Sequence, residues 1–304
     1  MALTLFYSPL YTDALSPEAR FPRQRYRLVR AALQPEVSRG LIDIQPPRCA
    51  SLAEIKTVHE PAYVDDFLGG RLDRSRVRRI GFRPWTADFV ERTLRLTGGT
   101  LQATEAVLAG AALAGNMGGG THHAYRDFGS GYCVFNDMAI AAALALGRGQ
   151  VGRVAVIDLD VHQGDGTAAI FEDEPRVMTF SMHGQRNFPF RKMRSDLDLG
   201  LEDEIDPSGY LGLLEEALER AVAPHRPELI FYQAGVDALA RDTLGRLALD
   251  HETLERRDAM VLDFAASCGC PMVICMGGGY ADPIEDSVLA HAQLFRAAAQ
   301  RLAT

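Results

Sequence analysis

Three side chains that can bind metal or move protons follow one apolar stretch at alternating positions. Asp158, Asp160 and His162 lie at the end of the segment VGRVAVIDLDVH. Residues two apart on an extended segment point to the same side, so this spacing groups one imidazole with two carboxylates. Adding Asp237, which follows the run ELIFYQAG, gives an Asp, His, Asp set with a fourth position open, as in catalytic zinc sites. The alternative is a polar strand end whose side chains only hydrogen-bond loop backbone.

Two adjacent histidines and a tyrosine add proton-transfer chemistry. His122 and His123 follow a glycine triplet at 118–120, and Tyr280 follows a second triplet at 277–279. Imidazole titrates near neutral pH and can serve as base and then as acid, while a tyrosine hydroxyl can donate to a developing oxyanion. Glycines permit close backbone approach around such a site. The alternatives are that one histidine belongs to the core or the surface and that the tyrosine only packs.

A further glycine pattern, GDGTAA at 164–169, fits the dinucleotide fingerprint between a strand and a helix. The next apolar run, RVMTFSMH, ends without the acidic residue that should bind a ribose. This absence argues against a dinucleotide site.

The elements that must position these residues form an alternating series in the second half of the chain. The apolar runs are VGRVAVIDLD (151–160), RVMTFSMH (176–183), ELIFYQAG (228–235) and PMVICMGGG (271–279), and helical patterns lie near 167–172, 208–223, 251–268 and 286–302. Runs that are apolar on both faces suit a covered parallel sheet, and their alternation with helices predicts a three-layer α/β/α architecture with a mostly parallel central sheet. Ligands in such folds bind at the carboxyl ends of the strands, where the candidate residues lie.

The first half is less regular. We expect an irregular N-terminal region, a helix over 23–33 and a longer helix over 86–113 that is broken at Gly98 and Gly99. The loops at 10–22, 69–84 and 184–196 are expected to shape the entrance of the site.

Composition limits the class of protein. The 304 residues are 47% hydrophobic and 24% charged, and no linker divides them, so we expect one domain over 1–304. A net charge of −8 without a basic block argues against a nucleic-acid partner. The longest apolar run, Met138 to Leu146, is too short to span a membrane, and the start carries no secretory signal, so we expect a cytoplasmic protein. The 5 cysteines form no disulfide framework and are expected to be reduced and mostly buried.

Five motifs in order carry a family resemblance. They are GGGTHHA (118–124), GSGYCVFNDMA (129–139), DLDVHQGDGTA (158–168), YQAGVDAL (232–239) and MGGGY (276–280). From about Phe6 to Phe295, the sequence resembles the zinc-dependent histone deacetylase family, which has the arginase/deacetylase fold. The pair His162 and Gln163, the compact length and the stretch RFPRQRY (20–26) are most similar to the class IV branch and its bacterial relatives.

The resemblance implies a role for each candidate. It places one Zn²⁺ on Asp160, His162 and Asp237, with His123 as general base and acid and His122 as its electrostatic partner. Asp158 and Asp165 would orient His122 and His123 respectively, and Tyr280 would donate to the oxyanion.

The resemblance also implies a substrate tunnel and a second ion. Gly131, Tyr132, Phe188 and Leu244 match tunnel positions, and tyrosine stands at position 132 where phenylalanine is common, which would change the tunnel's polarity. A structural K⁺ would be held by Asp158, Asp160, His162, Ser181 and the backbone of Met182.

The sequence therefore predicts an amide hydrolase that removes acetyl or longer acyl groups from lysine side chains, or from a related acylated amine, by metal-activated water. Alternatives are an acetylpolyamine or other small-molecule amidohydrolase of the same fold, and a non-catalytic module that binds acylated ligands. Leu244 stands where polyamine deacetylases have an acidic residue, and Ala238 and Leu239 stand where two-metal ureohydrolases need another aspartate. Intact His123 and Tyr280 argue against a binding module. The sequence gives no indication of the oligomeric state.

Overall fold

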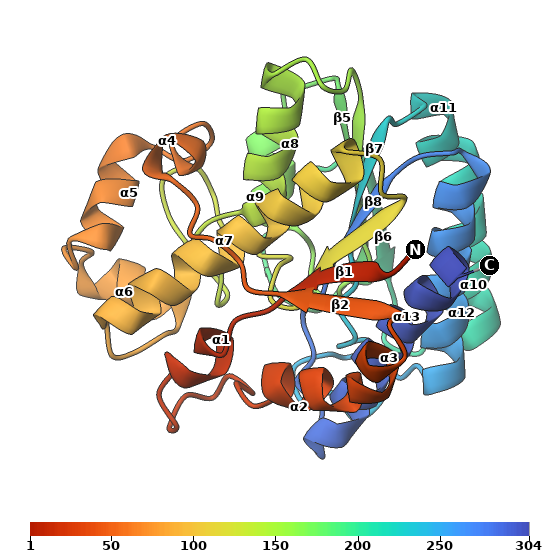
Figure 1. The fold of residues 1–304 in the computed structure, drawn as a ribbon, viewed down its shortest axis with the longest axis horizontal. Coiled ribbons are helices and arrows are strands. Elements are labelled where there is room, and N and C mark those ends of the chain that lie inside the picture. Colours follow the sequence, from red (N-terminus) through yellow and green to blue (C-terminus); the bar gives the residue numbers. More distant parts are fainter. Residues whose placement is uncertain (304) are drawn as a thin grey trace.

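The most apolar runs of the sequence form the neighbouring strands β8, β7, β4 and β5 of one eight-stranded sheet, in a computed structural model that describes residues 1–303 (Figure 1). The order is β2-β1-β3-β8-β7-β4-β5-β6, and every pair of neighbours is parallel. The strands are β1 (Leu3–Phe6), β2 (Ile42–Gln45), β3 (Leu113–Asn116), β4 (Val154–Asp158), β5 (Val177–Gly184), β6 (Leu197–Leu201), β7 (Leu229–Gln233) and β8 (Met272–Cys275). All residues of β4, β5, β7 and β8 are buried, as strands covered on both faces require. The predicted parallel sheet is confirmed.

Helices cover both faces of the sheet, which gives the predicted three layers (Figure 1). On one face α7 packs on β1, β3 and β8, while α8 packs on β4 and α9 on β5; on the other, α13 packs on β1, α2 and α12. The helices are α1 (Leu10–Asp13), α2 (Arg25–Ala32), α3 (Gln34–Ser38), α4 (Leu52–Ile55), α5 (Pro61–Leu68), α6 (Arg74–Ile80), α7 (Ala87–Leu108), α8 (Asp137–Gly147), α9 (Asp165–Phe171), α10 (Pro207–Ala217), the π-helical turn η1 (Leu218–Val222), α11 (Ala223–His225), α12 (His251–Ser267) and α13 (Ile284–Ala303).

The prediction of an irregular N-terminal region was wrong, because β1 lies there; β2, which follows the first predicted helix, was missed as well, and the two strands form one end of the sheet. Strands β3 and β6 were also missed. Each of β1, β2 and β3 has only four residues, and β3 reads LAGN, whose glycine and asparagine are poor strand formers. Strand β6 is an edge strand that alternates between partly buried and exposed residues, and it reads LDLGL. Parallel pairing, rather than local sequence, defines these strands.

The prediction that the long helix breaks at Gly98 and Gly99 was also wrong, since α7 runs through both residues and ends at Leu108. A Cβ on Gly98 would lie 1.9 Å from the carbonyl oxygen of Arg48, and one on Gly99 would lie 2.9 Å from the side chain of Asn116. The two glycines therefore allow close packing against the helix. The chain leaves the helical conformation at Gly110, whose φ is +112°.

Buried apolar side chains from both helical layers and the sheet form one continuous cluster. The longest apolar run of the sequence lies in α8, where eight of its eleven residues are buried. Over residues 1–303, no helix combines the length and the apolar character needed to cross a membrane. The five cysteines are free, and three of them, Cys133, Cys270 and Cys275, are buried, as expected.

Candidate active site

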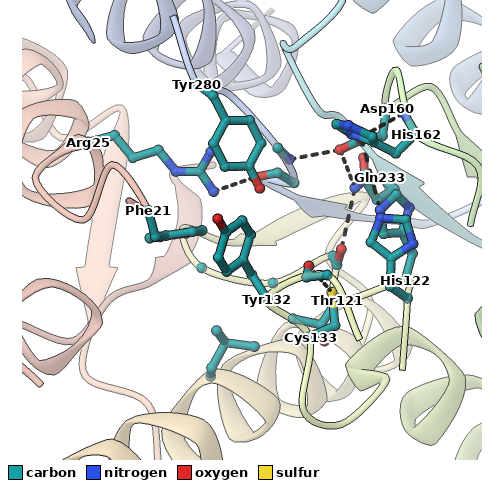
Figure 2. A pocket seen from close by; sticks show the side chains of 18 of the residues that line it. Phe21, Arg25, Thr121, His122, Tyr132, Cys133, Asp160, His162, Gln233 and Tyr280 are labelled. Atoms are coloured by element: carbon teal, nitrogen blue, oxygen red, sulfur yellow. Dashed lines mark hydrogen bonds and ion pairs between the residues drawn. The ribbon is translucent and has the colours of Figure 1, made fainter. Parts of the chain in front are cut away.

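Loops that follow four neighbouring strands meet at one edge of the sheet. The loop after β4 carries Asp160 and His162, the loop after β7 carries Asp237, the loop after β8 carries Tyr280, and the loop after β3 carries the histidine pair. In Figure 2, Asp160, His162 and His122 lie on one side of the pocket and Tyr280 and Tyr132 on the other. The parallel sheet thus brings together residues more than 150 positions apart in the chain.

Asp160, His162 and Asp237 form a buried cluster whose ligand atoms all lie within 4.8 Å of one another. The Nδ1 atom of His162 lies 3.0 Å from Asp160 Oδ1 and 3.1 Å from Asp237 Oδ2. The second oxygen of each carboxylate is held elsewhere: Asp160 Oδ2 accepts from the Gly278 N–H at 2.8 Å, and Asp237 Oδ1 accepts from the Val161 N–H at 2.8 Å. One oxygen of each carboxylate is therefore directed toward the imidazole.

The electrostatics of this cluster fit a cation. Burial and the neighbouring Asp160 raise the pKa of Asp237 to about 7. Burial would lower the pKa of His162, but its hydrogen bonds to Asp160 and Asp237 raise that pKa to about 10. The two carboxylates thus stabilise a positive charge between them, here that of the protonated His162 imidazole. Two buried carboxylates and one imidazole are a donor set that divalent zinc accepts.

The adjacent histidines have opposite electrostatic environments although their ring centroids lie 4.0 Å apart. The Nδ1 atom of His122 lies 2.7 Å from Asp158 Oδ2, and that of His123 lies 2.6 Å from Asp165 Oδ1. Burial lowers the pKa of His122, but the charges of Asp158 and Asp160 outweigh it and raise this pKa to about 9. Burial and the repulsion from His122 lower the pKa of His123 to about 4, despite Asp165. One ring is therefore cationic and the other neutral at pH 7.

Tyr280 faces Asp160 and His162 from the opposite side of the pocket (Figure 2). Its ring centroid lies 6.4 Å from that of His162 and 6.1 Å from that of Tyr132. Its backbone N–H donates to Asp242 Oδ2 at 2.6 Å, which fixes the loop after β8. Burial holds the pKa of the Tyr280 hydroxyl well above its usual value, against the opposing effect of the Arg25 guanidinium. The hydroxyl therefore keeps its proton and can donate it in a hydrogen bond.

A cavity of about 370 Å³ leads to these groups, and all four predicted tunnel residues line it. Phe188 packs edge-on against His123, with ring centroids 4.9 Å apart. Gly131 has a φ of +51°, and a Cβ there would lie 2.5 Å from Cδ2 of His123, so this position requires glycine. Tyr132 forms part of the wall, and Leu244 is 45% exposed.

The residues predicted to hold K⁺ are all buried around β4 and β5, whose register pairs Asp158 with Ser181. Asp158 Oδ1 accepts from the Asp160 N–H at 3.2 Å, and Ser181 Oγ lies 3.0 Å from His183 Nδ1. In residues 1–303, the only His, Cys, Asp and Glu cluster with metal-ligand spacing is Asp160, His162 and Asp237. The potassium site remains a prediction.

Several residues that build the pocket were not assigned by the sequence. Arg25 is fully buried and donates to the carbonyl oxygens of Gly277 at 2.7 Å and Gly279 at 2.8 Å, beside Tyr280 (Figure 2). Together with other residues it lines a smaller inner cavity of about 50 Å³. Gln233 donates to Asp160 Oδ2 at 2.8 Å. Gln233 could have been noticed in the sequence as a polar residue at the end of an apolar run. Arg25 could not, because its burial depends on contacts with residues far along the chain.

Asp137 was missed as well. Its Oδ1 accepts from the Thr121 N–H at 2.7 Å, and its carboxylate accepts from the Gly120 N–H, so it fixes the turn that precedes the two histidines. The Thr100 hydroxyl also donates to it.

Comparison with known proteins identifies the family of this chain. The model of the histone deacetylase domain family matches residues 19–295. An uncharacterized protein of a Picosynechococcus species is 44% identical over 98% of this chain and 99% of its own length. Histone deacetylase 2 of Arabidopsis thaliana is 32% identical over 80% of this chain and 66% of its own, and acetoin utilization protein AcuC of Bacillus subtilis is 31% identical over 90% and 76%. The chain therefore belongs to the histone deacetylase domain family.

Proposed function

We propose that this protein is a zinc-dependent amide hydrolase that removes acetyl or longer acyl groups from lysine side chains or from a related acylated amine. The observation that carries the proposal is the buried cluster of Asp160, His162 and Asp237, whose His162 lines the same cavity as His123 and Tyr280. Membership of the histone deacetylase domain family supports the reaction class.

Asp160, His162 and Asp237 would hold the ion, because one oxygen of each carboxylate converges with the Nδ1 atom of His162 while the second oxygens are held by backbone N–H groups. Zn²⁺ bound there would supply Lewis-acid chemistry, which polarises a carbonyl and makes water a stronger nucleophile near neutral pH. The fixed second oxygens of the two carboxylates keep the ligands in place before the ion binds.

His123 would carry the proton through the reaction. The low pKa of His123, about 4, leaves its ring unprotonated at pH 7 and able to accept a proton from the attacking water. Asp165 holds the Nδ1 side of the ring, so Nε2 is the atom that receives this proton and passes it to the leaving amine. The cationic His122 beside it would stabilise negative charge that develops on the substrate.

Tyr280 would donate its hydroxyl proton in a hydrogen bond to the tetrahedral oxyanion as the amide carbon is attacked. Phe188 and Tyr132 would flank the aliphatic part of the acylated amine, since both line the cavity that leads to His123. Leu244 at the mouth offers no carboxylate for a cationic polyamine.

The test combines metal analysis with a substrate panel. The purified protein should contain close to one zinc per chain and should hydrolyse acetyl-lysine or long-chain acyl-lysine peptides. Activity should disappear on chelation and return with Zn²⁺, and His123→Ala should abolish turnover without releasing the metal.

Each contrary result has a clear meaning. Full hydrolysis after exhaustive chelation, or in His123→Ala, would refute the mechanism. A preference for acetylated polyamines over every peptide would favour the small-molecule amidohydrolase. Binding of acylated ligands by a metal-loaded protein that never cleaves them would favour a binding module.

A further inference from the structure

The mouth of the cavity carries positive charge only. Arg78 and Arg79 line the cavity that reaches His123, and within residues 1–303 no aspartate or glutamate lines it. A wider hollow of about 1010 Å³ adjoins it and shares Arg78, Gly81 and Tyr132 with it. This hollow adds Arg20 and Arg83, and its one carboxylate is Glu18. We call Arg20, Arg78, Arg79 and Arg83 the arginine rim.

The rim arginines are exposed, and none of them has an ionic partner among residues 1–303. Other arginines of the same segment do: Arg71 lies 3.1 Å from an oxygen of Asp66, and Arg76 lies 3.8 Å from one of Asp73. In the described part of the chain, no carboxylate oxygen lies within 4.0 Å of a rim guanidinium. Four unpaired like charges around one hollow repel each other, so a bound anion would stabilise them.

Backbone hydrogen bonds connect the rim to the tunnel wall. The N–H of Gly131 donates to the carbonyl oxygen of Arg79 at 3.1 Å, and the N–H of Tyr132 donates to that of Ile80 at 2.8 Å. The guanidinium carbon of Arg79 lies 4.5 Å from the ring centroid of Phe128. The end of α6, which carries Arg78 and Arg79, is therefore hydrogen-bonded to the wall residues Gly131 and Tyr132.

Two simpler explanations do not account for the rim. Arginines in the last turn of a helix stabilise its carboxyl end, which applies to Arg78 and Arg79 in α6. Arg20 and Arg83, however, lie outside any helix. A generally basic surface is also excluded, because the whole chain has a net charge of −8. The positive charge at the entrance is a local feature of an acidic protein.

We propose that the substrate carries a carboxylate close to its acylated amine and that the arginine rim binds this carboxylate. This inference rests on the proposed deacylase function and names the substrate class for the same site. The carboxylate has two possible sources, an acidic side chain beside the acyl-lysine of a peptide or the α-carboxylate of a free Nε-acyl amino acid. A peptide with basic residues beside the acyl-lysine would be repelled by this entrance.

The test compares kcat/KM for matched acetyl-lysine peptides whose flanking residues are glutamate, glutamine or lysine. An exposed ion pair changes binding by up to about fivefold, so kcat/KM for the Glu peptide should exceed that for the Gln peptide by about two- to fivefold at low salt. The Lys peptide should be the poorest. The preference should shrink as ionic strength rises, since about 0.15 M salt screens charges beyond roughly 8 Å.

The double variant Arg78→Gln/Arg79→Gln should bring the Glu to Gln ratio close to one. The control is Arg148→Gln, because Arg148 is exposed, follows the last residue of α8 and lies far along the chain from the rim, so this substitution also removes positive charge at a helix end. The control should keep the full ratio. Equal rates for Glu and Gln peptides in the unsubstituted protein, or an unchanged ratio in the double variant, would overturn the inference.

The second arm compares free Nε-acetyl-lysine with its α-carboxamide. A rim-dependent preference for the free acid would identify an amino acid as the source of the carboxylate, and a preference confined to the peptides would identify an acidic flank. Both outcomes support the proposal that the arginine rim binds a carboxylate of the substrate.

Peptide binding to the metal-stripped protein separates this inference from the proposed function. Fluorescence anisotropy should show tighter binding of the Glu peptide and loss of the difference in the double variant. A retained binding preference without any hydrolysis by the metal-loaded protein would refute the deacylase function and support the rim, whereas hydrolysis without a charge preference would do the reverse.

Discussion

At the scale of single residues, the candidate site gives similar groups unequal environments. His122 and His123 are neighbours, but two carboxylates act on His122, whereas burial and the charge of His122 dominate at His123. The difference places a cation and a neutral base side by side. Tyr280 completes the set from the opposite wall of the pocket.

Tyr280→Phe tests the hydrogen bond to the oxyanion. The change removes only the hydroxyl group and leaves the packed aromatic ring in place. The variant should therefore fold and keep its metal. Loss of one oxyanion donor typically lowers kcat by about 10²–10³. The measurement is kcat with an acyl-lysine peptide, alongside the metal content. Turnover close to that of the unsubstituted protein would exclude this role.

His59 provides a pH-dependent test away from the catalytic groups. Its Nε2 accepts from the Asn136 N–H at 2.9 Å, so its Nδ1–H donates to the carbonyl oxygen of Tyr125 at 2.9 Å. Burial lowers the pKa of His59 to about 4. Its contribution to stability is therefore complete above the unfolded pKa of about 6.5 and is lost as the pH falls toward 4.

Between pH 7 and pH 5, the unfolded state gains a proton at His59 that the folded state mostly excludes. The free energy of unfolding should fall by about 2 kcal/mol more in the unsubstituted protein than in His59→Gln over this interval. Urea unfolding at the two pH values measures the difference, in which the contributions of the other histidines cancel. Parallel losses in both proteins would show that His59 titrates normally.

At the scale of elements, the strands that precede Asp160, His162, Asp237 and Tyr280 were predictable, whereas β3, which precedes the two histidines, and strands β1, β2 and β6 were not. The runs that form β4, β5, β7 and β8 are apolar on both faces, and that pattern survives without tertiary information. Strands β1, β2 and β3 have four residues each and contain at least one polar residue, whereas β8 is equally short but apolar throughout and lies in the longer run PMVICMGGG. For helix α7 the prediction failed in the opposite way, because a break was expected where none exists. Its glycines allow close packing and do not end the helix.

Gly98→Ala tests that packing. In an exposed helix this change usually stabilises a protein, but here the new Cβ would lie 1.9 Å from the carbonyl oxygen of Arg48. We expect the free energy of unfolding to fall by about 2–3 kcal/mol. The control is Gly212→Ala in α10, where a Cβ meets nothing within 4 Å and should add about 0.5–1 kcal/mol. Denaturant unfolding compares the two, and a stabilised Gly98→Ala would contradict the close approach.

At the scale of the whole molecule, the candidate site is built from segments that lie far apart along the chain. The metal-ligating candidates could be picked out by type and spacing, because aspartate and histidine at alternating positions are informative before folding. Arg25 and the arginine rim could not, because their meaning depends on which distant segments lie next to them. The sequence therefore identified the chemistry better than it identified the groups that support and surround it.

Metal binding should stabilise the whole fold. The two buried carboxylates near His162 repel each other, and a ligand that binds only the folded state adds about 4 kcal/mol when present at about 1,000 times its dissociation constant. We expect Zn²⁺ to raise the melting temperature of the chelated protein by roughly 5–10 °C. Asp160→Asn should lose most of this increase, while Gly212→Ala should keep it. An equal rise in all three proteins would show that the ion binds elsewhere.

The contact between Arg25 and the glycine loop has a consequence for how the protein is made. The guanidinium near the start of the chain donates to a carbonyl oxygen 252 positions later. A nascent chain still attached to the ribosome has no partner for this arginine until Gly277 has emerged. The inner wall of the pocket is therefore among the last parts to assemble, and until then the charge of Arg25 is without its two carbonyl acceptors.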